Sequence, residues 1–252
     1  MATVAESRRS RINAVMRGDE RVTPLELFFD LVFVLAMTQC TALMAHDPTW
    51  PGIAQGLLVL GVLWWTWVGY SWLTSVVDPE EGAVRLAIFG AMAALLVVSL
   101  CVPRAFGELA LTFAVAYGVV RVGQIALFHI ASRDDPALRH SVNGLAVGTA
   151  VGVSLLALSS KFDGLAQGGL WALALALDVS APYFFIDATG WKLAPRHFAE
   201  RHGLILIVAL GESIVAIGVA AELGLDAGIV AAAVVGIALV AALWWIYFDV
   251  VA

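Results

Sequence analysis

Charged residues are scarce in this chain of 252 residues, because Asp, Glu, Lys and Arg make up only 13% of it. Soluble globular domains carry about 25%. This scarcity excludes a soluble globular enzyme, and the high apolar content excludes an intrinsically disordered chain. A basic excess is also missing, since 14 Lys and Arg stand against 20 Asp and Glu. The composition therefore predicts no nucleic-acid partner.

Cysteines and catalytic motifs are equally sparse. The two cysteines, Cys40 and Cys101, both lie inside apolar runs, which excludes a disulfide scaffold. The sequence has no P-loop, no dinucleotide-binding fingerprint, no Gly-x-Ser-x-Gly and no His-Glu-x-x-His pattern. We therefore expect no enzyme activity, no cofactor and no metal site.

Long apolar runs are what the sequence has in excess, with 61% of the residues hydrophobic. A helix needs roughly 20 apolar residues to cross the hydrocarbon core of a bilayer. Eight runs of about this length alternate with breaks rich in Pro, Gly and charge, which predicts an all-α, polytopic transmembrane bundle in contact with lipid. The predicted spans are Leu25–Ala45, Gly52–Val77, Ala83–Val102, Ala105–Ala131, Leu138–Ser159, Gly164–Ile186, His197–Ala221 and Ala227–Val251.

The distribution of Lys and Arg predicts the orientation. With eight spans, eleven of the 14 basic residues fall on the side of the N-terminus, only Arg104 and Lys161 fall on the other side, and Arg121 lies within a span. Because Lys and Arg are retained on the cytoplasmic side, both ends of the chain are expected there. Residues 1–24 are thus predicted to be a basic cytoplasmic segment and residues 25–252 a transmembrane domain of the cytoplasmic membrane.

An internal repeat is a further prediction. The segment that begins at Asp30 aligns with the one that begins at Glu212, acid on acid and apolar on apolar. A Trp pair follows each acid at a similar separation, Trp64-Trp65 after the first and Trp244-Trp245 after the second. An offset of six spans gives both copies the same orientation in the membrane. The pattern predicts a six-helix parallel repeat whose second copy is incomplete.

Ionisable residues within the spans are the candidate functional residues, since a charge at the bilayer centre costs at least about 2.5–3.5 kcal/mol. Most are expected in the inner half of the bilayer, where they could meet. One interpretation is a polar pathway for a monovalent cation or proton, and the other is mutual neutralisation, with Arg121 paired to Asp178 or Asp30. The candidates for an ion pathway are Glu26, Asp30, Asp178 and Glu212, and the candidate charge partners are Arg121, Glu200, Arg201 and His202.

The histidines at the start of the seventh span allow several interpretations. His197 and His202 lie among Arg196, Glu200 and Arg201, a setting typical of interfacial capping and pairing. A proton relay is the alternative. A third hypothesis is a membrane enzyme that acts on lipid through His197, Glu200 and His202.

Small residues at a spacing of four are typical of close helix contacts in membranes. Gly144, Gly148 and Gly152 form such a face on the fifth span, and Gly52 and Gly56 on the second. We interpret both faces as packing surfaces, and the chain as a possible homo-oligomer.

Two long stretches resemble one family. VTPLELFFDLVFVLAMTQ, residues 22–39, and HFAERHGLILIVALGESIVAIG, residues 197–218, are similar to the bacterial low-temperature requirement A family. Its members are typically longer, with further spans, which agrees with a last span that ends without a polar tail and predicts a fragment. The family is named for growth at low temperature and implies no molecular activity. Our hypothesis is therefore a cation or proton transporter or channel, with a non-transporting sensor or scaffold for adaptation to low temperature as the alternative.

Overall fold

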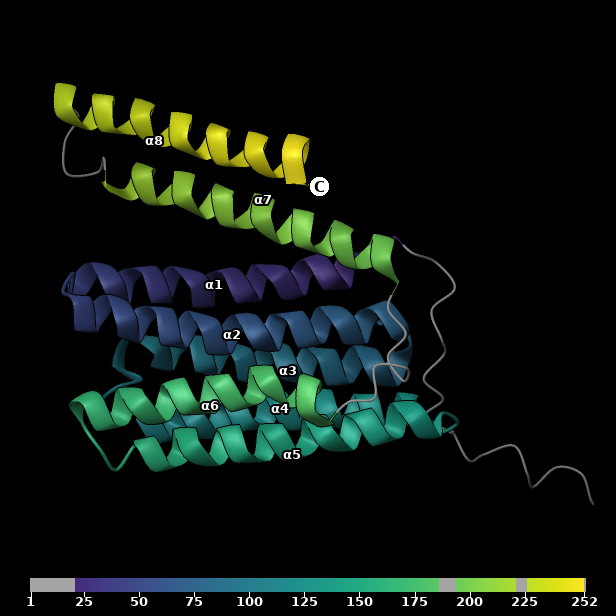
Figure 1. Cartoon of the computed structure of the whole chain (residues 1–252). Helices are drawn as coiled ribbons and strands as arrows, with labels where there is room; N and C mark the ends of the chain where they lie inside the picture. Colours follow the sequence, from purple (N-terminus) through teal and green to yellow (C-terminus); the bar gives the residue numbers. More distant parts are fainter. Residues whose placement is uncertain (1–20, 186–193, 221–225, 252) are drawn as a thin grey trace, which may run out of the picture.

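The computed structural model describes residues 21–185, 194–220 and 226–251, and its regular elements are helices (Figure 1). Eight helices in this part of the chain are long and apolar enough to cross a membrane. This confirms the predicted all-α, polytopic bundle. Most of the predicted basic segment, residues 1–20, lies outside the described residues. The helices are α1 (Pro24–His46), α2 (Trp50–Val76), α3 (Gly82–Cys101), α4 (Ala110–Ala131), α5 (Pro136–Ser159), α6 (Gly164–Phe185), α7 (Pro195–Ala220) and α8 (Ala227–Trp245).

Several helices begin with the same local device, a polar capping side chain followed by proline. Thr23, Thr49 and Asp135 each accept a hydrogen bond from a backbone N–H of the first turn, and each precedes a proline at the first or second helical position. Proline suits this position because its fixed φ is helical and the N–H it lacks would have no helical acceptor. These caps place the helix starts within a few residues of the predicted ones.

The connection between the third and fourth spans is longer than predicted. We expected only Pro103 and Arg104 to separate them, with a helix from Ala105, but α4 begins at Ala110. A 3₁₀ turn covers Val102–Arg104, and the carbonyl of Arg104 accepts a hydrogen bond from the backbone N–H of Leu109. Residues 105–109 contain a single charged residue, Glu108, between apolar neighbours, so the turn is hard to distinguish from the apolar runs on either side.

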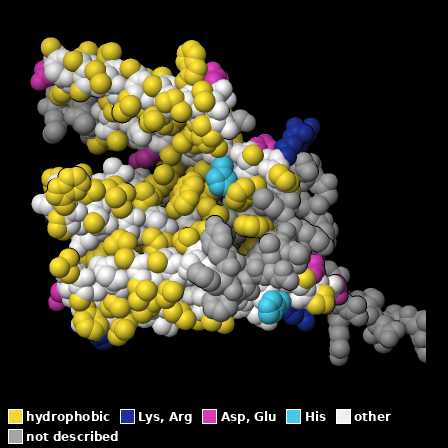
Figure 2. All heavy atoms as spheres, viewed as in Figure 1, with side chains coloured by type: hydrophobic (Ala, Val, Ile, Leu, Met, Phe, Trp, Pro, Cys, Tyr) yellow, Lys and Arg dark blue, Asp and Glu magenta, His cyan; other side chains and the backbone are white. Residues whose placement is uncertain are grey.

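The helix α2 occupies the middle of the bundle. It packs on α1, α4, α6 and α7, while α7 and α8 form an outer layer beside α1 (Figure 1). Helix α8 packs on α7 and has no buried residue of its own. In Figure 2 hydrophobic side chains cover much of the visible surface, and most charged side chains lie toward the ends of the helices. This surface is suited to lipid around the middle and water at both ends.

The predicted repeat can be compared with the observed helix levels. Helices α1 and α7 run in the same direction in Figure 1, as a parallel repeat requires. However, Asp30 contacts Arg201, whereas Glu212 contacts Thr38, eight residues further along α1 than Asp30. At about 1.5 Å of rise per residue, the two aligned acids therefore lie roughly 12 Å apart along the helix axis. The six-helix repeat stays a prediction.

The close approach of α5 and α6 gives a first expected result. A Cβ at Gly148 would stand 2.7 Å from Cβ of Ala181 on α6, whereas Gly90 on α3 faces open space. We expect Gly148→Ala to destabilise the bundle by about 1–3 kcal/mol, because the added methyl overpacks this contact. Gly90→Ala is the matched control and should leave thermal unfolding of the detergent-solubilised protein unchanged. Equal unfolding temperatures for the two variants would contradict the close α5–α6 contact.

Candidate functional site

Helix α1 carries two acidic side chains into the bundle. Glu26 and Asp30 are four residues apart and so lie on one helical face. Both are buried, with 1% and 0% of their surface exposed. The Oε2 atom of Glu26 accepts a hydrogen bond of 2.8 Å from the backbone N–H of Thr23, which completes the capping box of the helix. Its other carboxylate oxygen, Oε1, is left to face α7.

Helix α7 presents a matching pair. His197 and Arg201 are also four residues apart and also buried. The guanidinium of Arg201 donates from Nη1 to Oε1 of Glu26 at 3.1 Å and from Nη2 to Oδ1 of Asp30 at 2.6 Å. The Nε2 atom of His197 lies 3.0 Å from the same Glu26 oxygen. One arginine thus bridges two carboxylates, and an imidazole stands against one of them.

Helix α2 completes this group with aromatic and hydroxyl side chains. Trp67 donates from its indole nitrogen to Oδ1 of Asp30 at 2.7 Å, and its ring lies 5.5 Å from the guanidinium carbon of Arg201, a cation–π distance. The hydroxyl of Thr74 accepts from Arg201 at 3.2 Å. The ring of His202 meets Trp67 edge-on at 4.9 Å. We call Glu26, Asp30, Trp67, Thr74, His197 and Arg201 the α1–α7 network.

The charges of the α1–α7 network do not balance by themselves. Two carboxylates face one guanidinium, so the network carries one surplus negative charge when His197 is neutral and none when one proton is added. A low-dielectric interior penalises a net buried charge. The network is therefore suited to hold one exchangeable proton.

The hydrogen bonding of the network is also incomplete. Oδ2 of Asp30, Nε of Arg201 and Nδ1 of His197 are buried and have no hydrogen-bond partner in the described part of the chain. A small cavity of about 10 Å³ adjoins Glu26, Thr74 and Arg201. It has room for about one water molecule. Each of these three atoms is therefore able to form one more hydrogen bond.

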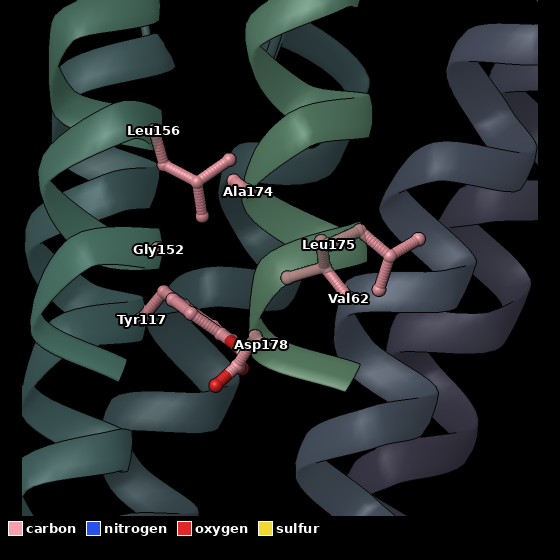
Figure 3. A pocket seen from close by; sticks show the side chains of 7 residues that line it. All are labelled: Val62, Tyr117, Gly152, Leu156, Ala174, Leu175 and Asp178. Carbon is pink, nitrogen blue, oxygen red and sulfur yellow. Dashed lines mark hydrogen bonds between the residues drawn. The ribbon is translucent and has the colours of Figure 1, made fainter. Parts of the chain in front are cut away.

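A second buried ion pair joins α4 to α6. Nη2 of Arg121 donates to both oxygens of Asp178, at 2.8 and 2.9 Å, and to the hydroxyl of Thr149 at 2.7 Å. Its Nη1 donates to Gln124 at 2.8 Å. Figure 3 shows Tyr117 and Asp178 facing each other beside another small cavity. One positive and one negative charge make this Arg121–Asp178 pair neutral by itself.

The two groups of charges are separate, which corrects the expectation that the inner charges could meet. Helix α2 lies between them, and its Tyr70 donates a 2.8 Å hydrogen bond to the carbonyl of Val120 on α4. Arg121 therefore pairs with Asp178 and not with Asp30. The separation follows from the packing of α2, which no local pattern in the sequence reveals.

The remaining candidates lie outside both groups. Glu200 is exposed at the start of α7 and takes no part in the network, so it is not the charge partner that we expected. Glu212 is half-buried further along α7, where it forms a 2.6 Å hydrogen bond with Thr38. His202 contacts the network through its ring, and its Nδ1 lies 2.8 Å from the carbonyl of Phe198.

The sequence did not predict the buried position of His197 or the capping role of Glu26. The sequence favours interfacial capping and pairing for His197. The structure pairs it with Glu26 but places it inside the bundle, and its spacing of four from Arg201 is the signal for that position. The capping role of Glu26 was also missed, although Thr23-Pro-Leu-Glu26 has the spacing of a capping box. In the described part of the chain, no three His, Cys, Asp or Glu side chains are arranged to hold a metal ion.

Comparisons with known proteins agree with the two stretches described above. The family model for the bacterial low temperature requirement A protein (LtrA) matches residues 21–252. A curated protein of Rhizobium meliloti (strain 1021), named only as uncharacterized, is 32% identical over 243 residues. That match covers 88% of this chain and 57% of the relative, so the chain spans a little over half the length of that protein. No solved structure matches the chain.

Proposed function

We propose that this chain, which belongs to the bacterial low temperature requirement A (LtrA) family, moves protons across the membrane that it spans. The observation that carries the proposal is the α1–α7 network, in which two buried carboxylates share one arginine. The network becomes neutral by taking up one proton, and a tethered guanidinium already fills the place that a metal cation would need. This favours a proton over potassium or sodium.

The path that we propose follows the contact between α1 and α7. Glu26 and His197 lie toward the start of both helices, and Asp30 and Arg201 come one turn further. Glu212 lies about two thirds of the way along α7. Buried apolar residues, Phe33 and Ile205, follow the network on the two helices. They separate it from Glu212, so transfer requires α7 to shift relative to α1. Few of the described residues of α7 are buried, which supports such a movement.

The orientation that we propose follows the basic residues at the helix ends. Arg104 and Lys161 lie on one side of the bundle. Five described basic residues lie at the opposite ends of the helices, namely Arg21, Arg85, Arg133, Arg139 and Arg196. The side with more Lys and Arg is normally cytoplasmic. We therefore place the start of α1 and the network toward the cytoplasm, in the bacterial cytoplasmic membrane.

Proton flux into proteoliposomes is the test. We expect flux driven by a membrane potential, and we expect Asp30→Asn to abolish it, because the amide cannot accept and release a proton. Glu200→Gln is the matched control, since it removes an exposed acid from the neighbouring helix α7 at the same end of the bundle, and it should retain full flux. Potassium and sodium gradients measured in parallel should give no flux that depends on Asp30.

A sensor or scaffold that does not transport is the second candidate. The observation that favours it is the dryness of the bundle, since the cavities at both charge groups have room for about one water molecule. Absence of flux from well-folded protein that contains the chain would overturn the transport proposal in favour of this one. Flux that survives Asp30→Asn would overturn the role of the network.

A further inference from the structure

The contacts of the Thr38 hydroxyl bear on the protonation of Glu212. The hydroxyl oxygen of Thr38 lies 3.0 Å from the carbonyl of Val34, one turn earlier on α1, and 2.6 Å from Oε1 of Glu212 on α7. A threonine hydroxyl has one hydrogen and can donate only once. Neither a carbonyl nor a carboxylate can donate in return. If Glu212 is ionised, the carbonyl and the carboxylate have to share that single hydrogen in a three-centre bond. A protonated carboxyl of Glu212 supplies a hydrogen of its own and makes each contact a separate hydrogen bond.

The surroundings of Glu212 point the same way. In the described part of the chain Glu212 has no ion pair, although every other acid buried among the helices has one. Helix α7 packs on α1, α2 and α8, so all three can present groups to it. Helices α2 and α8 contain no Asp, Glu, Lys, Arg or His. The charged groups on α1 nearest to Thr38 are Asp30 and His46, each eight residues away.

The charged groups on α7 itself are also remote from Glu212. They are Arg196, His197, Glu200, Arg201 and His202, all ten or more residues before it, which is roughly 15 Å or more along the helix. Arg201, moreover, is already bound to Glu26 and Asp30. Among the described residues, the neutral side chain that hydrogen-bonds to Glu212 is that of Thr38. Within the described part of the chain, an ionised Glu212 would therefore be stabilised by one hydroxyl inside a membrane span.

Glu212 also borders the lipid-facing side of its helix. It is half-buried, and the next three residues, Ser213, Ile214 and Val215, are exposed on a helix that spans the membrane. A small apolar molecule dissolved in the bilayer can therefore approach this carboxyl, whereas Glu26 and Asp30 are sealed inside the bundle.

We propose that Glu212 is a proton-carrying carboxylic acid, which donates its hydrogen to Thr38 and is open to modification from the lipid by an apolar carbodiimide. This deepens the proposed function by assigning a proton site on α7, but its evidence is the Thr38 geometry and the surroundings of Glu212, not transport. Loss of the proton obliges Thr38 to turn its hydrogen from Val34 to Glu212. The contact between α1 and α7 is thereby sensitive to one proton.

The chemistry of the modification is complete without another reactant. The proton of the Glu212 carboxyl passes to a nitrogen of the carbodiimide, and the carboxyl oxygen bonds to its central carbon. The acyl group then migrates from that oxygen to nitrogen, which gives a stable N-acylurea and expels no leaving group. An ionised carboxylate that is held in an ion pair has no proton to start this addition.

Infrared difference spectroscopy of the protein in lipid tests the protonation directly. We expect Glu212→Gln to remove a carbonyl band of a protonated carboxyl that the unaltered protein has at neutral pH. We expect Thr38→Val to shift this band, because the acid loses its acceptor. Thr41→Val is the matched control, since Thr41 makes the same kind of bond to a carbonyl one turn earlier but is exposed and has no acidic partner. It should leave the band in place.

Labelling with dicyclohexylcarbodiimide, followed by mass spectrometry of peptides, tests the access from lipid. We expect adduct on the peptide that contains Glu212, at least tenfold above the peptide that contains Glu26 and Asp30, and none on Glu212→Gln. A spectrum without a band lost in Glu212→Gln, or labelling no greater than on the α1 peptide, would overturn this inference. Neither measurement depends on transport. If the protein shows the infrared band but no proton flux, only the proposed function is refuted.

Discussion

Replacing Arg201 by glutamine is expected to destabilise the folded protein by about 3–5 kcal/mol. The guanidinium of Arg201 bonds to both Glu26 and Asp30. Its removal leaves two buried carboxylates that face each other without a positive charge between them. Uncompensated buried charge costs far more than the ion pair contributes when it is intact. Reversible unfolding in mixed detergent micelles, followed by tryptophan fluorescence, measures this loss.

The control for this variant is Arg196→Gln. Arg196 lies one turn before Arg201 on α7 but is exposed, so we expect a change within about 0.5 kcal/mol. The triple variant Arg201→Gln, Glu26→Gln, Asp30→Asn should regain part of the lost stability, because no buried charge is then left without a partner. If Arg201→Gln unfolds like Arg196→Gln, the α1–α7 network does not hold the two helices together.

Replacing Asp178 by asparagine is expected to destabilise the folded protein by a similar amount, about 3–5 kcal/mol. Here the buried charge left without a partner is positive. Arg121 is 1% exposed, and its Nη2 atom donates hydrogen bonds to both oxygens of Asp178. The variant leaves that guanidinium buried among Gln124, Thr149 and Tyr117, which offer only neutral oxygens. Equilibrium unfolding of the same kind measures the effect.

A double-mutant comparison separates charge from packing at this site. Arg121→Met combined with Asp178→Leu should be more stable than either single change, because it leaves no buried charge. The exposed pair of Arg104 and Glu108 is the control, with about two thirds of each side chain exposed. Removal of either partner there should cost no more than about 1 kcal/mol. A double variant as unstable as the sum of the two single ones would contradict the ion pair.

The charge balance distinguishes what the two buried groups can do. The Arg121–Asp178 pair is neutral, and its hydrogen bonds connect α4, α5 and α6. This arrangement suits a structural role in holding the three helices together. The α1–α7 network has an acid in excess and an unbonded oxygen on Asp30, and it joins the bundle to the lightly packed α7. For this reason we place proton movement at the network and not at the pair.

Much of the fold was predictable because it depends on local composition. Eight apolar runs of the right length can form little except membrane-spanning helices, since every backbone group must be bonded within its own segment. The error at the third connection arose where the turn, residues 105–109, has a single charged residue, Glu108, between apolar neighbours. Family membership was equally predictable, because two long stretches around Asp30 and Arg201 carry the resemblance.

The candidate site was predictable as a set of residues but not as an arrangement. A charge within a span needs a partner wherever it lies, so composition alone singled out Glu26, Asp30, Arg121, Asp178 and Glu212. Which charges meet depends on the rotation and neighbours of each helix. These are set by the packing of α2 between the two groups and of α7 against α1, through contacts between residues as far apart as 175 positions. The helices, their place in a membrane and the scarcity of charge follow from composition and are therefore readable in the sequence. Packing between distant helices sets the rest: Arg201 bonds to both Glu26 and Asp30, and Glu212 has no ion pair among the described residues.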